Sequence, residues 1–263
     1  MQRLALEEMI AHHISHQAVR RALDERTAPV LPGNATLTRQ FVDQLDFQLT
    51  GAQSRVINEI AADLNRARPM YRLVQGDVGS GKTVVAALAL LNAVASHRQV
   101  AVMAPTELLA EQHFASFYNW LEPLGIRVVW LGGRQGARER RDTLRALADG
   151  QASVAVGTHA LFQSDVRFAA LGLAVIDEQH RFGVHQRLSL LSKGSDGDDG
   201  SDTLTPHQLI MTATPIPRTL AMTACAHLDV SSIDELPKGR KPIDTAVLPE
   251  HRREALIDRV ERA

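Results

Sequence analysis

The sequence predicts an α/β fold in which a doubly wound, mainly parallel sheet carries helices on both faces. From residue 50 onward, short apolar runs alternate with longer helix-like segments. Most of the runs are continuously apolar, as in 100–104 and 173–176, which is typical of parallel strands covered on both faces. A glycine-rich stretch, 76–83, lies between one such run and a helix-like segment. Together these observations predict a domain assembled from successive β–α units.

The apolar runs and the gaps between them place the individual elements. Strands are expected at 72–75, 99–104, 126–131, 153–157, 171–177 and 208–213, and helices at 54–66, 82–96, 107–121 and 137–149. Upstream, residues 3–25 favour a helix with Leu6, Ile10, Ile14 and Ala18 on one face, and 27–34 interrupt it. A short second helix is expected to follow Thr38 and to end before Phe47.

The same pattern divides the chain into three parts. Residues 1–46 form a helical linker segment, 47–242 the α/β domain, and 243–263 a linker and the start of a further β–α unit. That unit would have a strand at 244–248 and a helix at 250–262. The acidic, glycine-rich stretch 193–203 is expected to be a flexible exposed loop, because it lacks apolar residues to bury.

Composition sets limits on what the chain can be. It has 263 residues, 44% of them hydrophobic, a net charge of −1 and one cysteine. No stretch approaches the roughly 20 apolar residues of a membrane span, and Met1 opens a mixed-charge segment rather than a secretory leader. A cytoplasmic setting is expected, and nucleic acid could be bound only through local patches and backbone contacts. In the cluster His12, His13 and His16, adjacent histidines point to different helix faces and no carboxylate completes a set, which favours a solvated or packed face over a metal site.

The stretch 76–83 is a complete phosphate-binding loop of the form G-x-x-x-x-G-K-[ST]. Its glycines let backbone N–H groups point at phosphate oxygens, and the helix that follows adds its dipole. In this pattern the lysine pairs with the β- and γ-phosphates, and the hydroxyl residue after it ligates Mg²⁺. The residues expected to bind the nucleotide are Gly76, Val78, Gly79, Ser80, Gly81, Lys82 and Thr83. The alternative, a glycine-rich turn that binds nothing, is disfavoured by the strand before the loop and the helix after it.

Two further strand ends carry polar groups. The run 173–176 ends in Asp177 and Glu178, at the sheet edge where the phosphate loop must also lie. Asp177 would hold Mg²⁺ through a water, and Glu178 would act as general base on the attacking water. Thr212 and Thr214 end the last strand, and could sense the γ-phosphate or contact the carboxylate strand. Alone, each could be an ordinary strand end.

This set of motifs resembles the core of superfamily 2 helicases, which implies a RecA-like P-loop domain that uses ATP and Mg²⁺. The segment 177–180 resembles motif II in its Asp-Glu-x-His form, which adds His180 to the catalytic set. Segment 104–113 resembles motif Ia and 156–161 motif Ib, which implies DNA backbone contacts at Thr106, Thr158 and His159. Thr212-Ala213-Thr214 resembles motif III, which implies a coupling role. Gln53, three residues after Thr50, resembles the glutamine that recognises adenine.

Longer strings sharpen the resemblance to one group within superfamily 2, the bacterial branched-DNA translocases. These strings are 177–187, 211–221 and 233–242. The resemblance implies remodelling of forks and junctions in recombination and repair. The wedge domain of that group has no counterpart in residues 1–263, and of its second motor lobe only the truncated start, in 243–263, could be present. The chain therefore corresponds to a first motor lobe expected to turn over little ATP alone.

Three alternatives remain open at the level of the sequence. The chain could be the first lobe of a transcription–repair coupling translocase, which shares the Arg-Phe-Gly-Val run at 181–184. It could belong to another P-loop class, although no Asn-Lys-x-Asp motif of GTPases and no Leu-Ser-Gly-Gly-Gln signature of transporter ATPases occurs. It could also be a nucleotide-binding module without turnover.

Overall fold

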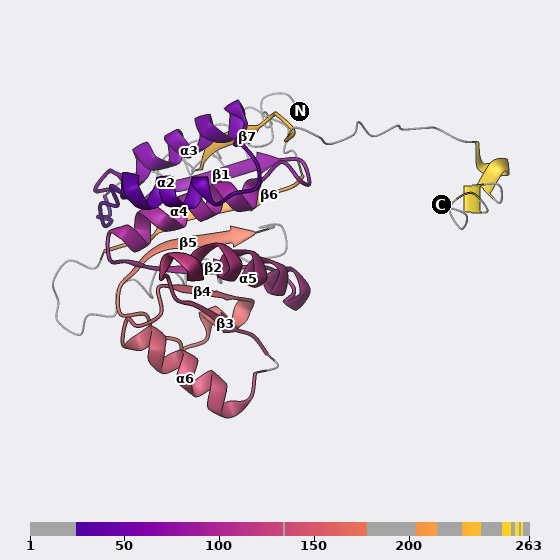
Figure 1. The fold of residues 1–263 in the computed structure, drawn as a ribbon. Helices are drawn as coiled ribbons and strands as arrows, with labels where there is room; N and C mark the ends of the chain where they lie inside the picture. Colours follow the sequence, from indigo (N-terminus) through magenta and orange to yellow (C-terminus); the bar gives the residue numbers. More distant parts are fainter. Residues whose placement is uncertain are drawn as a thin grey trace, which may run out of the picture.

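A computed structural model of the protein describes residues 25–133, 135–177, 204–214, 228–237, 249–253, 256, 257 and 259. In this part of the chain one sheet has seven strands, in the order β3-β4-β2-β5-β6-β1-β7, and every neighbouring pair is parallel. The strands are β1 (Tyr71–Gly76), β2 (Gln99–Met103), β3 (Val128–Leu131), β4 (Val154–Gly157), β5 (Leu171–Asp177), β6 (His207–Thr212) and β7 (Asp229–Ile233). The predicted parallel α/β fold is therefore confirmed (Figure 1).

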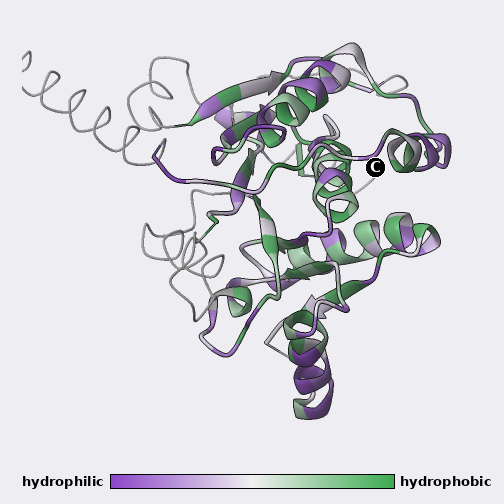
Figure 2. Ribbon diagram, turned by 90° about the vertical axis from the view of Figure 1, so that its left-hand side faces the viewer, coloured by the Kyte–Doolittle hydropathy of each residue, from purple (hydrophilic) through white to green (hydrophobic). Residues whose placement is uncertain are grey.

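Helices cover both faces of this sheet, as the alternating side chains of the strands require. The helices are α2 (Ala35–Asp43), α3 (Gly51–Leu64), α4 (Lys82–Ala95), α5 (Glu107–Leu121) and α6 (Ala137–Ala148), with short 3-10 turns at Glu122–Leu124, His159–Phe162 and Glu250–Arg252. In β2, Val100 and Val102 pack in one core with α2, α3, α4 and α5, whereas Ala101 and Met103 face a second core that includes α6. In Figure 2, which is coloured by hydropathy, central strands of the sheet are partly hydrophobic, whereas α6 at the bottom of the view is largely hydrophilic.

Several element boundaries differ from the prediction by one to three residues, including that of α3, which was expected at 54–66, and one strand was missed. The helix expected after Thr38 begins at Ala35, because the side chain of Asn34 caps it by accepting from the amides of Thr36 and Leu37. The third strand begins at Val128 rather than at residue 126. The missed strand is β7, whose sequence Asp-Val-Ser-Ser-Ile has few apolar residues because it lies at the edge of the sheet.

Several predictions fall on residues outside the described parts. These are most of the helix at 3–25 with its three histidines, the acidic loop 193–203, the strand at 244–248 and much of the helix at 250–262. The division at residue 46 remains a prediction, although Leu31 and Phe41 belong to the same core as α3 and α4. None of the helices in the described ranges is both long enough and apolar enough to cross a bilayer.

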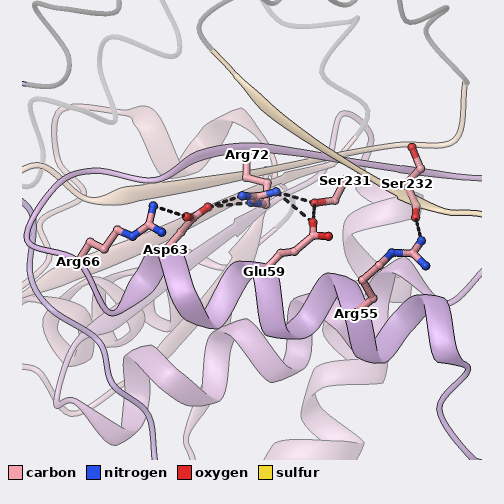
Figure 3. Close-up of polar contacts among 7 residues, drawn as sticks. All are labelled: Arg55, Glu59, Asp63, Arg66, Arg72, Ser231 and Ser232. Atoms are coloured by element: carbon pink, nitrogen blue, oxygen red, sulfur yellow. Dashed lines mark hydrogen bonds and ion pairs between the residues drawn. The ribbon is translucent and has the colours of Figure 1, made fainter.

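A partly buried ion-pair network joins α3 to strands β1 and β7 (Figure 3). The guanidinium of Arg72 donates to the Asp63 carboxylate at 2.8 and 2.6 Å, and also contacts Glu59 at 3.2 Å. Ser231 of β7 accepts from Arg72 at 2.7 Å and donates to Glu59. The side chains of Arg72 and Asp63 are only 12% and 11% exposed. This network fixes the missed edge strand against the helix that precedes β1.

Another buried polar residue, His207 at the start of β6, joins the sheet to the segment before α2. Its Nδ1 accepts from the amide of Met70 at 3.0 Å, and its Nε2 donates to the carbonyl of Pro29 at 2.7 Å. The side chain is fully buried. Burial lowers the pKa of His207, although the Pro29 carbonyl and the charge of Asp63 oppose the shift. The imidazole is therefore neutral in the folded protein, since a proton on Nδ1 would face the Met70 N–H.

We expect this histidine to make the fold sensitive to acid. Because the folded pKa lies below the unfolded value of about 6.5, its contribution is complete above that pH and is lost as pH falls through the folded pKa. Urea unfolding at pH 7.5 and 5.5 should show a larger loss of stability in the wild type than in His207→Gln. An equal loss in both proteins would show that other groups cause the acid sensitivity.

Candidate nucleotide-binding site

The glycine-rich loop between β1 and α4 has the geometry of an anion-binding turn. Gly79 and Gly81 adopt φ values of 77° and 85°, a region that favours glycine. Gly81 is the N-cap of α4, and no side chain supplies a cap bond there. The first amides of a helix lack intrahelical partners, so this N-terminus presents donors and the positive end of a dipole. Both features fit a phosphate group.

The lysine of the loop folds back onto the loop backbone. The Nζ of Lys82 donates to the carbonyls of Gly76 and Asp77, at 2.7 and 3.0 Å, so its ammonium group lies over the loop. Ser80 is fully buried, and a Cβ at Gly76 would lie 2.6 Å from its Oγ. Val78 is 66% exposed at the tip, and Thr83 is the second residue of α4. The loop thus brings together all the residues that the sequence assigned to it.

Gln53 holds the loop from the first turn of α3. Its Oε1 accepts from the amide of Thr50 at 2.8 Å, while the Thr50 Oγ accepts from the amide of Gln53 at 3.1 Å, which completes a capping box. Its Nε2 donates to the carbonyl of Ser80 at 2.8 Å, and the residue is 1% exposed. In this structure, both ends of the amide that was predicted to read adenine contact the protein itself.

The chain that leaves β7 is tied to the same helix end. The carboxylate of Glu235 accepts from the amide of Ala52 at 2.9 Å. Arg55 donates to the carbonyl of Ser232 and pairs with Asp234 at 2.8 Å (Figure 3 draws its contact with Ser232). The hydrogen bond from Arg55 lowers the pKa of Asp234, although both side chains are exposed. No pattern in the sequence predicts these contacts, which join residues far apart in the chain.

Strand order brings Asp177 and the threonine pair to the edge of the loop. β6 lies between β1 and β5, with Thr212 opposite Gln75 and Met211 opposite Asp177. The parallel strands all end at this edge, so the loop, Thr212 and Asp177 lie at the ends of three adjacent strands. The hydroxyls of Thr212 and Thr214 lie 2.9 Å apart, and the Thr212 Oγ also accepts from the Thr214 amide. Glu178 and His180 lie outside the described residues.

A histidine that the sequence assigned no role contacts Asp177. The Nε2 of His113, in α5, lies 2.7 Å from Oδ2 of Asp177, and both residues are 9% exposed. The imidazole stacks on Phe117, with ring centroids 6.0 Å apart. His113 shares the buried face of α5 with Ala110, Phe117 and Leu121. A polar residue on an otherwise apolar helix face was the signal that could have marked it.

A cleft lies along the same edge, beyond the ends of β2, β3 and β4. This cleft of about 480 Å³ is lined by Pro105, Glu107, Gly132, Gly133, Gln135, Arg140, Thr158, His159, Ala160 and Gln163. Two of the three predicted DNA contacts, Thr158 and His159, therefore line one cleft. The third, Thr106, stands between two lining residues and caps α5 by accepting from the Leu109 amide. Sequence reasoning missed Arg140, which donates to Gln163 and Asp165.

The class of protein follows from the family that the sequence matches. Residues 50–223 match the DEAD/DEAH box helicases, which is more than half of the chain. The chain belongs to the DEAD/DEAH box helicase family. This confirms the predicted RecA-like motor domain and the resemblance to superfamily 2.

Within this family, the chain is most informatively compared with RecG helicases. The chain is 56% identical to the ATP-dependent DNA helicase RecG of Escherichia coli, over 99% of this chain and 37% of the relative. It is 44% identical to RecG of Aquifex aeolicus, over 98% of this chain and 32% of the relative. A solved structure of RecG bound to a three-way DNA junction superposes with a TM-score of 0.86 at 37% identity, covering 99% of this chain and 34% of that one. The chain thus spans about a third of the length of these relatives, and the resemblance to branched-DNA translocases is confirmed.

Proposed function

We propose that the chain is the ATP-binding motor lobe of an ATP-dependent DNA helicase that remodels branched DNA in the bacterial cytoplasm. The observation that carries the proposal is the uncapped N-terminus of α4 behind a complete phosphate loop, one strand away from the strand that ends in Asp177. The similarity to RecG, including the structure bound to a three-way junction, supports DNA as the partner.

The chemistry of the site suits Mg²⁺-ATP. Lys82 would exchange its two carbonyl partners for the β- and γ-phosphates, which are stronger, charge-assisted acceptors. Thr83 and Asp177 offer the oxygen ligands that Mg²⁺ prefers. The ion would bridge phosphate oxygens and neutralise charge that develops during transfer. Glu178 would orient and deprotonate the attacking water, and His180 follows on the same segment; these two assignments rest on the motif alone.

Gln53 has two roles that compete in this proposal. As a reader of adenine, it would offer one donor and one acceptor to the edge of the base. In the structure its Nε2 instead holds the carbonyl of Ser80, and its Oε1 caps α3. A base could engage Gln53 only by replacing one of these bonds, which would link adenine recognition to the position of the loop.

DNA would lie across the cleft beside α5 through its phosphate backbone. Thr158 and His159 line the cleft, and Thr106 ends the loop that leads into α5. Contacts from hydroxyls and backbone amides need no net positive charge, which suits a chain of charge −1. The Thr212–Thr214 pair sits between the two nucleotide-site strands and would couple the DNA and ATP sites.

The overall proposal is tested by ATP turnover. Residues 1–263 are expected to bind ATP but to hydrolyse it slowly, because an arginine from a second lobe is typically worth about 10³–10⁵ in rate. Hydrolysis should be measured with a three-way junction, with linear duplex and without DNA, for this chain and for a longer polypeptide that includes it. Stimulation by junction DNA in the longer protein supports the proposal. ATP binding without turnover in either protein would favour a nucleotide-binding module.

Replacing Lys82 by alanine is expected to weaken ATP binding. The lost charge-assisted contact is worth roughly 1.5–3 kcal/mol, which corresponds to about tenfold or more in Kd. Titration of a fluorescent ATP analogue measures the change, with Arg145→Ala on the exposed face of α6 as a control. Equal affinity in wild type and Lys82→Ala would place the nucleotide elsewhere.

A further inference from the structure

His113 connects the two functional edges of the lobe. α5 starts at the cleft, where Pro105 and Glu107 are lining residues, and it carries His113 about 10 Å further along the helix axis. There the imidazole meets Asp177, at the end of the strand beside the nucleotide site. One rigid helix therefore touches the candidate DNA cleft at its N-terminus and the candidate Mg²⁺ ligand two turns later.

The contact is built to fix orientation. A carboxylate only accepts, so the Nε2–H of His113 donates to Oδ2 of Asp177. Phe117 stacks on the imidazole, and both partners of the bond are buried. Leu173 and Val175 of β5 face the core that contains α4 and α5, so Asp177 projects from the same side of the strand. With Oδ2 engaged, Oδ1 remains as the second acceptor of the carboxylate.

The start of α5 is also anchored to the cleft. Thr106 caps the helix, and the carboxylate of Glu107 accepts from the amide of Gly133 at 3.2 Å. A phosphate backbone that entered the cleft would meet Glu107 and the Gly132–Gly133 turn together. Any displacement of this end would move the whole helix, because the α5 hydrogen bonds make it a single rigid element.

We propose that His113 is a positioning residue that orients Asp177 for its metal and, through α5, couples nucleic acid in the cleft to Mg²⁺-nucleotide in the loop. The inference rests on the proposed function and adds a route between its two sites. Outer partners of metal ligands typically contribute about 10–100-fold to metal affinity or activity. Coupling between two sites is reciprocal, so each ligand changes the affinity for the other by the same factor.

Three substitutions separate the hydrogen bond from the packing of the ring. His113→Phe keeps a ring that can stack on Phe117 but donates nothing to Asp177, whereas His113→Gln restores an N–H donor at a similar reach. Phe117→Leu loosens the same core while it leaves the donor in place. Thermal unfolding of each variant reports the purely structural effect.

The first measurement is the Mg²⁺ concentration for half-maximal binding of a non-hydrolysable ATP analogue. It should rise about tenfold or more in His113→Phe, recover largely in His113→Gln, and change little in Phe117→Leu. An equal rise in Phe117→Leu and His113→Phe would overturn the positioning role, because general loosening of α5 would then explain both.

The second measurement is the affinity for a fluorescent three-way junction with and without the Mg²⁺-analogue complex. In the wild type these two affinities should differ. In His113→Phe the ratio of the two affinities should approach one. A wild type that binds both ligands with no mutual effect, or an unchanged factor in His113→Phe, overturns the coupling. A wild type that binds no junction DNA contradicts the proposed function instead, so the two failures are distinguishable.

Discussion

Replacing Arg72 by methionine is expected to lower the free energy of unfolding by about 3–5 kcal/mol, the usual effect of removing one member of a buried ion pair. The variant leaves the carboxylate of Asp63, only 11% exposed, without its strongest partner. It also removes the donor to Ser231, so this residue of β7 loses its side-chain contact with β1 and keeps only its bond to Glu59 of α3. Equilibrium unfolding in urea measures the loss directly.

Arg55→Met provides a matched control for this prediction. Arg55 also links α3 to the chain around β7, through Ser232 and Asp234, but its side chain is 51% exposed and that of Asp234 is 69% exposed. Exposed pairs contribute little to stability, so this variant should unfold close to the wild type. Asp63→Leu combined with Arg72→Met should regain part of the loss, because no buried charge is then left unpaired. Similar losses in Arg55→Met and Arg72→Met would show that burial of the ion pair does not determine its contribution to the free energy of unfolding.

The sheet could be predicted largely because its central strands are buried on both faces. β2 and β5 read as continuous apolar runs, since helices cover each side of them and no residue needs to face water. The phosphate loop was equally clear, because a turn with φ above zero at two positions demands glycine there. Such local requirements are written in adjacent residues, and a single sequence is enough to find them.

The missed features depend on residues that are distant in the chain. β7 has two serines and an aspartate in five residues, and Ser231 is buried only because Arg72 and Glu59 bind it. Likewise, His113 and Asp177 are separated by 64 positions, and nothing in either neighbourhood reveals the other. Polar contacts of this kind are determined by strand order, which the apolar pattern does not specify.

The sequence marks Gln53 as a functional residue, but it does not predict the contacts that Gln53 makes in the fold. Its place three residues after Thr50 at the start of a helix is a capping-box signature, which can be read from the sequence. Its bond to the carbonyl of Ser80 could not be predicted, because that contact requires the loop to curl over the end of α3. In the structure, Gln53 therefore also holds the phosphate loop, in addition to the adenine recognition that its motif predicts.

This contact makes Gly81 sensitive to any added side chain, because a Cβ there would meet Gln53. Gly81→Ala is expected to destabilise the protein by about 2–5 kcal/mol and to weaken ATP binding. A left-handed backbone costs a residue with a Cβ about 1–2 kcal/mol. The new Cβ would also meet the amide nitrogen of Gln53, and the displaced side chain would lose hydrogen bonds worth about 0.5–1.5 kcal/mol each.

Gly125→Ala isolates the backbone part of this effect. Gly125 has a φ of 75°, close to the 85° of Gly81, but a Cβ there would meet no atom within 4 Å. Its substitution should therefore cost only about 1–2 kcal/mol and leave ATP binding unchanged. In a Gln53→Ala background, the additional cost of Gly81→Ala should fall to the Gly125→Ala value, because the residue it displaces is gone. If the two glycine substitutions cost the same in the wild-type background, Gln53 does not hold the loop in the way described, and the link between α3 and the phosphate site has to be abandoned.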